Sequence, residues 1–85
     1  MNEQDFKIER IQDGTFRVTR TDIDGDYHTH MKSKQLAKTV IHNVCNDKIP
    51  LNSRNYTLIS MYRLSDDKRY RNKIQEILDT RKQKR

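Results

Sequence analysis

Apolar and charged residues alternate along the first third of the chain. Phe6 and Ile8 stand between charged neighbours, and Phe16 and Val18 flank a charged residue in the same way. Alternation with a period of two places apolar side chains on one face of a strand and polar side chains on the other. The pattern predicts three strands, at about residues 5–11, 15–23 and 26–32.

The only two glycines fall between these predicted strands, and both follow an aspartate, at Asp13-Gly14 and Asp24-Gly25. Tight turns between antiparallel strands require positive φ, which glycine adopts without strain. The three strands are therefore expected to form an antiparallel meander. A three-stranded sheet needs a helix packed on its apolar face to be stable.

A helical period replaces the alternation after Ser33, which is a favourable N-cap residue. Leu36, Val40 and Val44 recur every four residues behind it. This spacing predicts a helix over residues 34–46 that packs on the sheet. The predicted fold class is α+β, in one domain that spans residues 1–85.

Two more helices are expected in the last third of the chain, at about 54–64 and 66–81. Asn52 or Ser53 could cap the first of them, although its β-prone residues leave a strand as an alternative. Acidic residues at the start of the second suit the N-terminus of a helix. The ends of the chain, residues 1–4 and 82–85, are expected to be disordered.

Positive charge is concentrated in the last third of the chain. The net charge is −2 over residues 1–32, +2 over 33–52 and +6 over 53–85. This asymmetry favours a polyanionic partner, most often a nucleic acid, although a well-solvated basic helix would have the same composition. The sequence therefore predicts a small basic accessory protein that binds DNA or RNA or acts in regulation.

Basic and amide side chains in the last predicted helix are the candidate contacts. Lysine and arginine neutralise phosphates, and arginine and asparagine can also read base edges. The candidate nucleic-acid-binding residues are Lys68, Arg69, Arg71, Asn72, Lys73, Arg81 and Lys82. In this hypothesis the last helix enters a major groove and the helix at 54–64 supports it.

A protein partner is the alternative to a nucleic acid. Glu76 and Asp79 interrupt the basic segment, and the same charge could serve an acidic protein surface, as in an inhibitor or adaptor of the kind that mobile elements encode. A domain of this size also leaves little net stability from one core, so a homodimer remains an open alternative.

The predicted meander and first helix, over residues 6–46, resemble the N-terminal arm-site DNA-binding domain of mobile-element integrases. The residues behind this likeness are the runs Thr15-Phe16-Arg17-Val18 and Asp24-Gly25-Asp26-Tyr27. The resemblance implies DNA contacts from the polar face of the sheet, through Lys7, Arg17 and His28. The net negative charge of this part of the chain argues against such contacts.

No constellation in the sequence supports a metal site or catalysis. His28 and His30 share the polar face of a predicted strand, whereas His42 and Cys45 lie on the predicted helix across the sheet, so a zinc site is not expected. Two glycines cannot build a Gly-rich phosphate loop, and no nucleophile elbow is present. We expect no enzyme, no metal and no cofactor.

The cellular setting follows from the cysteine count and the apolar runs. Cys45 is the single cysteine, so no intramolecular disulfide can form, which fits a reducing compartment. The first twenty residues are rich in charge and lack the apolar run of a signal peptide. No segment approaches the ~20 apolar residues of a membrane span. We expect a cytoplasmic protein that does not contact a membrane.

Overall fold

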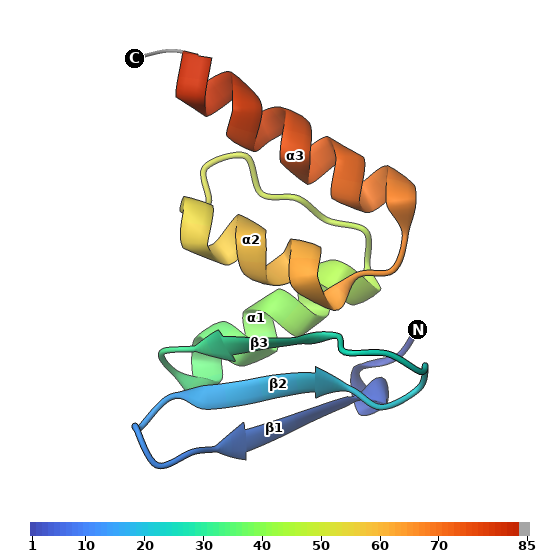
Figure 1. Cartoon of the computed structure of the whole chain (residues 1–85), viewed down its shortest axis with the longest axis vertical. Coiled ribbons are helices and arrows are strands. Elements are labelled where there is room, and N and C mark those ends of the chain that lie inside the picture. The colour runs from blue at the N-terminus through green and yellow to red at the C-terminus, as the bar shows by residue number, and fades with distance from the viewer. Residues whose placement is uncertain (84–85) are drawn as a thin grey trace.

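The computed structural model describes residues 1–83 and confirms the α+β class (Figure 1). A short 3-10 turn precedes three strands, which pair in the order β1-β2-β3 as an antiparallel meander. The elements are η1 (Glu3–Asp5), β1 (Phe6–Arg10), β2 (Phe16–Arg20), β3 (His28–Met31), α1 (Lys34–Cys45), α2 (Asn55–Leu64) and α3 (Lys68–Gln83).

The strand register separates the two faces of the sheet as the alternation predicts. Ile8 lies opposite Val18, which lies opposite Thr29, and this row faces the helices. Val18 and Thr29 are buried. The next row, which includes Thr19 opposite His28, belongs to the other face and is only partly buried.

The two connections between strands differ. Gly14 has φ +87° in a short turn, as the sequence predicts. The second connection is a loop over residues 21–27 and not the tight hairpin expected at Asp24-Gly25, although Gly25 does have φ +109°. The Thr21 N–H donates to the Asp5 carbonyl at 2.8 Å in the register of the β1–β2 pairs, the Thr21 hydroxyl donates to the same carbonyl at 3.0 Å, and the loop begins at this residue. The second and third strands are consequently shorter than predicted.

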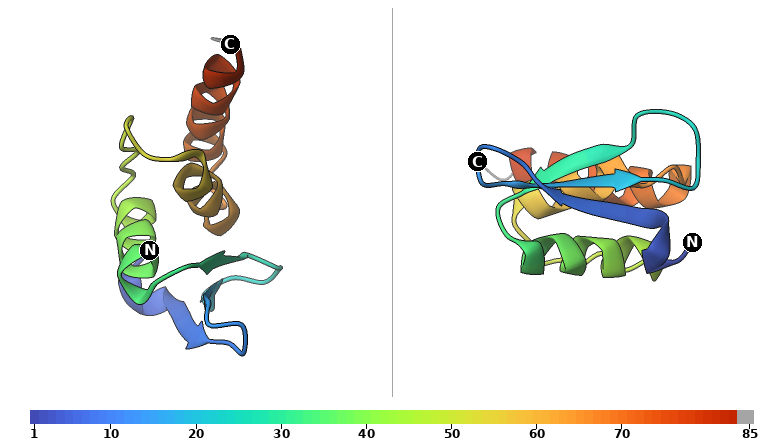
Figure 2. Two further views of the ribbon diagram at one scale, coloured as in Figure 1. Left: turned by 90° about the vertical axis from the view of Figure 1, so that its left-hand side faces the viewer. Right: turned by 90° about the horizontal axis from the view of Figure 1, so that it is seen from below.

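The helices stack outward from the sheet. α1 lies along one face of the three strands, and the right-hand view of Figure 2 shows the opposite face uncovered. α2 packs against β3 and α1, and α3 packs on α2 at the end of the molecule furthest from the sheet (Figure 1). Among residues 1–83, no helix combines the length and the hydrophobicity needed to cross a membrane.

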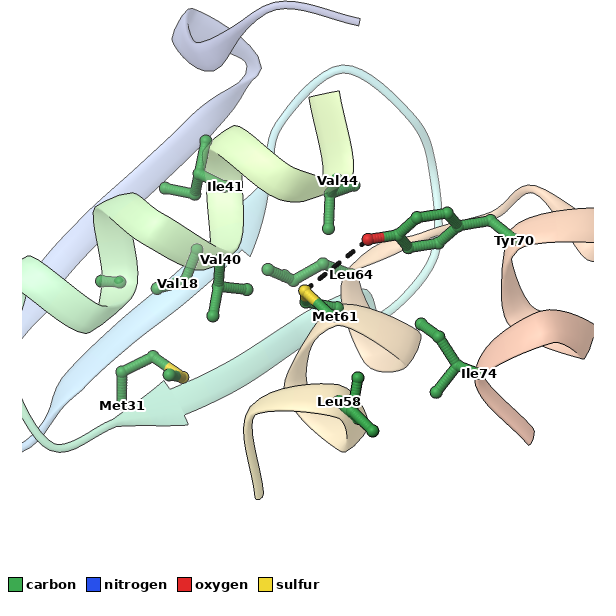
Figure 3. Packing of buried hydrophobic residues seen from close by; sticks show 11 residues of the cluster. Val18, Met31, Val40, Ile41, Val44, Leu58, Met61, Leu64, Tyr70 and Ile74 are labelled. Carbon is green, nitrogen blue, oxygen red and sulfur yellow. Dashed lines mark hydrogen bonds between the residues drawn. The ribbon is translucent and has the colours of Figure 1, made fainter. Parts of the chain in front are cut away.

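One buried cluster joins the sheet to all three helices (Figure 3). Its members are Val18, Met31, Ala37, Val40, Ile41, Val44, Leu58, Met61, Leu64, Tyr70 and Ile74. The Tyr70 hydroxyl reaches across this cluster, donates to the Lys48 carbonyl at 2.7 Å and lies 3.6 Å from the Met61 sulfur. Burial raises the pKa of Tyr70. This hydrogen bond ties α3 to the segment that connects α1 and α2.

The helix starts agree only partly with the sequence. The Ser33 side chain accepts from the Leu36 N–H at 3.1 Å, which confirms the predicted cap of α1. Residues 55–64 form a helix and not the alternative strand, because its buried positions recur at helical spacing. The N-cap position of α2 is occupied by Arg54, without a side-chain bond, and not by either predicted residue.

The described residues near each end of the chain form defined elements, and the disorder expected at 1–4 and 82–85 stays a prediction. The Asn2 N–H donates to the Asp5 carboxylate at 2.8 Å and closes the 3-10 turn η1. α3 continues past the predicted end at residue 81 to Gln83, because Arg81 anchors the last turns (described below). Residues 84–85 lie outside the described part of the chain.

Candidate nucleic-acid interface

α3 attaches to the molecule through one narrow side. Tyr70 and Ile74 are buried against α2, and Ile77 and Leu78 are half-buried beside them. Arg71 and Arg81 are half-buried as well, and the other described side chains of α3 are exposed. Since a helix turns by 3.6 residues, the basic side chains of α3 leave it in several directions around this buried stripe.

Arg69 and Lys73 lie on one side of the buried stripe, one helical turn apart. They line a hollow of about 230 Å³ together with Tyr70 and two carboxylates, Asp47 and Asp67. The carboxylates offset the positive charge at this position. This side of α3 is consequently a poorer site for phosphate than the sequence suggests.

Lys68, Asn72 and Lys82 are exposed on other sides of α3. Within residues 1–83, none of these three side chains forms a hydrogen bond or an ion pair. The two lysine ammonium groups and the Asn72 amide are therefore free to contact a ligand, but no cavity brings the three side chains together.

The Arg81 guanidinium already forms hydrogen bonds within the protein. Its guanidinium donates to the side-chain oxygen of Asn55 at 2.7 Å and to the Leu51 carbonyl at 2.8 Å. These bonds hold the end of α3 to the first residue of α2 and to the segment before it. The structure gives Arg81 a part in positioning α3 and leaves it few free donors for a phosphate.

Arg71 points to the side of α3 that faces the β2–β3 loop. Its guanidinium carbon lies 4.3 Å from the centroid of the Tyr62 ring, a stacked cation–π arrangement. The Nε atom of Arg71 is buried and has no hydrogen-bond partner among residues 1–83. The side chain is thus held by stacking, without a carboxylate to neutralise it.

A hollow of about 290 Å³ opens beside Arg71 between the β2–β3 loop and the α2–α3 pair. Its other lining residues are Asp26, Tyr27, His28 and Arg63. Arg63 comes from the end of α2, is exposed, and forms no ion pair within the described residues. The hollow brings two arginines from different helices to one place.

A second hollow, of about 280 Å³, adjoins the first along the open face of the sheet. Asp26 and His28 line both, and Arg17 and Thr19 complete the second. The His28 ring nitrogen pairs with the Asp26 carboxylate, which occupies the rim between the two hollows. The two hollows form one concave region that runs from β2 to α3.

Sequence reasoning found part of this region and missed Arg63. Arg71 is among the predicted nucleic-acid contacts, and the resemblance to arm-site domains implies DNA contacts from Arg17 and His28 on the open face of the sheet. Arg63 was assigned to a supporting helix, because no local pattern shows that it meets Arg71 eight positions later, across the turn between α2 and α3. Only the packing angle of the two helices brings them together.

Arg20 is a second residue that sequence reasoning missed. It is 5% exposed and donates to Asp22 (2.8 Å from both Nε and Nη2), to Asp66 (3.0 Å) and to the Leu64 carbonyl (3.0 Å). Hydrogen bonding to Asp22 raises the pKa of Arg20 further. The signal was available, because Arg20 continues the alternation of Phe16 and places a charge on the buried face.

The histidines and the cysteine remain apart. His28 and His30 meet edge to face on the open sheet face, with ring centroids 5.4 Å apart, whereas His42 and Cys45 lie on α1. Burial raises the pKa of the Cys45 thiol. Within residues 1–83, no three histidine, cysteine or acidic side chains gather where they could hold a metal ion. The absence of a metal stays a prediction.

Comparisons with protein-family models, with curated proteins and with solved structures found no match. The topological likeness to integrase arm-site domains therefore stays a prediction, and the functional proposal rests on the residues of this chain.

Proposed function

We propose that this chain is a small accessory protein that binds nucleic acid through the basic surface of α3 and the adjoining end of α2. The observation that carries the proposal is a set of unpaired charges. Within the described residues, no lysine or arginine of α3 forms an ion pair with a carboxylate. Residues 53–85 nevertheless hold a net charge of +6.

The energetics of such a surface favour a polyanion. Each phosphate that a lysine or arginine neutralises releases condensed counterions, which supplies sequence-independent affinity. α3 forms the outer layer of the molecule, so its basic sides are open to a long ligand from several directions (Figure 1). A binding role without catalysis, in the reducing cytoplasm that suits the single Cys45, completes the proposal.

A salt titration tests this function. A fluorescent oligonucleotide of mixed sequence, as DNA or as RNA, should bind at about 0.15 M salt, and log K should fall linearly with log salt. Changing Lys68, Arg69 and Lys73 together to glutamate should weaken binding and flatten that slope. Lys38→Glu on α1, an exposed lysine distant from α3, is the control. Binding that ignores salt would refute the proposal.

A protein partner is the second candidate, and one observation favours it. Leu51 is 74% exposed and lines a hollow of about 450 Å³ with Glu76, Ile77, Thr80 and Arg81; Ile59, which is 39% exposed, lines a neighbouring hollow that shares Arg81. Exposed apolar residues of this kind mark protein contacts, either with an acidic protein or with a second copy. In that case Leu51→Asp should abolish the association, measured by sedimentation, and oligonucleotides should not bind.

A further inference from the structure

We infer that the hollow lined by Tyr27, His28, Arg63 and Arg71 binds a phosphate group of a single-stranded nucleic acid. The inference rests on the proposed function and gives it a location that differs from the exposed outer sides of α3. Three elements and a loop build the site. Arg63 is the last residue but one of α2, Arg71 is the fourth residue of α3, His28 begins β3, and Tyr27 belongs to the β2–β3 loop.

Among the described residues, the Arg71 side chain has no hydrogen-bond acceptor, which distinguishes it from Arg20 and Arg81. Arg20 and Arg81 both donate to oxygen atoms of the protein. Arg71 is held by its stack on Tyr62, but no protein oxygen accepts from its guanidinium within residues 1–83, and its Nε lies buried without a partner. Buried donors without acceptors are rare because they cost free energy. Nε itself is covered by the protein, but the terminal guanidinium nitrogens also lack an acceptor in the described part of the chain, and Arg71 lines the hollow, so a phosphate oxygen there would accept from them.

The charge balance of the hollow favours an anion. Two arginines face it, and the one carboxylate on its rim, Asp26, is mostly exposed and already pairs with the His28 ring. A planar guanidinium binds phosphate oxygens with two parallel N–H donors. Because Arg71 is oriented by Tyr62 before a ligand arrives, little side-chain entropy is lost on binding.

The shape and the rings of the hollow favour a single strand. Grooves that bind single strands combine arginine or lysine with aromatic side chains, on which unpaired bases stack. Tyr27 and His28 supply rings beside the two arginines, and the second hollow continues the groove towards Arg17. The hollow is recessed between the β2–β3 loop and α3. On this side of the molecule neither α2 nor α3 can enter the major groove of a duplex, whereas the outer side of α3 is exposed.

Neutralising either arginine tests the site. Arg63→Gln and Arg71→Gln should each weaken the binding of a short single-stranded DNA of mixed sequence about tenfold, which is the loss of one charge-assisted hydrogen bond. Arg63 makes no contact that folding needs, so this variant keeps the test valid if Arg71→Gln is unstable. Arg10→Gln, an exposed arginine at the end of β1, is the matched control and should bind within twofold of the parent, ~0.4 kcal/mol.

Removing a negative charge from the hollow gives a second test, because binding should then become tighter. Asp26→Asn removes the only carboxylate that lines the hollow and should tighten binding about threefold. Asp24→Asn removes an equal charge from an exposed residue of the same loop that does not line the hollow, and it should have a smaller effect. Equal gains from both variants would show that only the overall charge matters and would contradict the site.

Arginine side-chain NMR locates the ligand directly. On addition of the single strand, the Nε–H signals of Arg63 and Arg71 should shift, whereas those of Arg20 and Arg81 should stay. Inorganic phosphate at the same ionic strength should shift the same two signals weakly. Binding that is retained in both glutamine variants would overturn the site and leave the proposed function standing. Tighter binding of the matching duplex would also overturn it, and no binding of either probe would overturn both.

Discussion

Two arginines, Arg20 and Arg71, each contact α2 or the link that follows it, yet their surroundings differ. Arg20 is buried and its guanidinium donates to two carboxylates and a carbonyl, so its charge is fully used by the fold. Arg71 is half-buried, stacks on Tyr62 and has no oxygen acceptor within residues 1–83.

The difference shows how one residue type can serve stability at one position and binding at another. A buried charge is tolerated only when partners replace the water that it loses. Arg20 meets that condition within the protein and joins the end of β2 to the start of the α2–α3 link. Arg71 meets it only if a ligand provides the acceptor. Mutation of Arg20 should therefore lower mainly the stability of the fold, and mutation of Arg71 should weaken mainly the binding of the ligand.

The largest expected effect on stability comes from Arg20. Arg20→Ala removes four hydrogen bonds and leaves Asp22 and Asp66 without their partner, so the free energy of unfolding should fall by about 2–3 kcal/mol. This estimate is at the lower end for broken buried pairs because both carboxylates remain partly hydrated. Urea denaturation measures it. A loss below about 0.5 kcal/mol, the usual range for a surface change, would show that Arg20 does not stabilise the fold.

Arg71 should matter much less for folding. Arg71→Gln removes the stack on Tyr62, which costs about 0.5–1 kcal/mol at a partly exposed site, and it also removes the unsatisfied Nε. We expect a net loss under about 1 kcal/mol by the same urea measurement, together with the weakened binding described above. A loss of unfolding free energy as large as that of Arg20→Ala would show that Arg71 stabilises the fold as Arg20 does, which would contradict the distinction between the two residues.

The smallest expected effect appears in acid. Hydrogen bonds from Arg20 lower the pKa of Asp22, so the stability that this pair contributes is fully present above the unfolded-state pKa of about 3.9 and is lost as the pH falls below it. Asp22→Asn should flatten the dependence of the free energy of unfolding on pH in this acidic range. Identical profiles for parent and variant would show that the pair is not formed in solution.

Local patterns in the sequence were sufficient to predict the elements of the fold. Alternation around Phe16 and Val18 predicts the sheet, and the four-residue spacing behind Ser33 predicts α1. The loop at 21–27 was not predicted, because the positive φ of Gly25 suits a tight hairpin turn and a longer loop equally well, so Asp24-Gly25 does not fix where β2 ends.

The candidate site was less accessible to sequence reasoning. The basic run on α3 identifies Arg71, but it does not distinguish this residue from Arg81, whose guanidinium donates hydrogen bonds within the protein. Arg63 could not be grouped with Arg71 without the packing of α2 on α3. Arg20 could have been found, since its position in the alternation requires a buried charge and hence a carboxylate partner.

The central claim, that Arg71 contacts a phosphate, is tested most directly by the salt dependence of single-strand binding. For single strands, log K falls with log salt by about 0.7 per phosphate neutralised. We predict that Arg71→Gln reduces the slope by about this amount, while Arg10→Gln, with the same change in net charge, leaves it unchanged. Equal slopes for the parent and Arg71→Gln would contradict the claim.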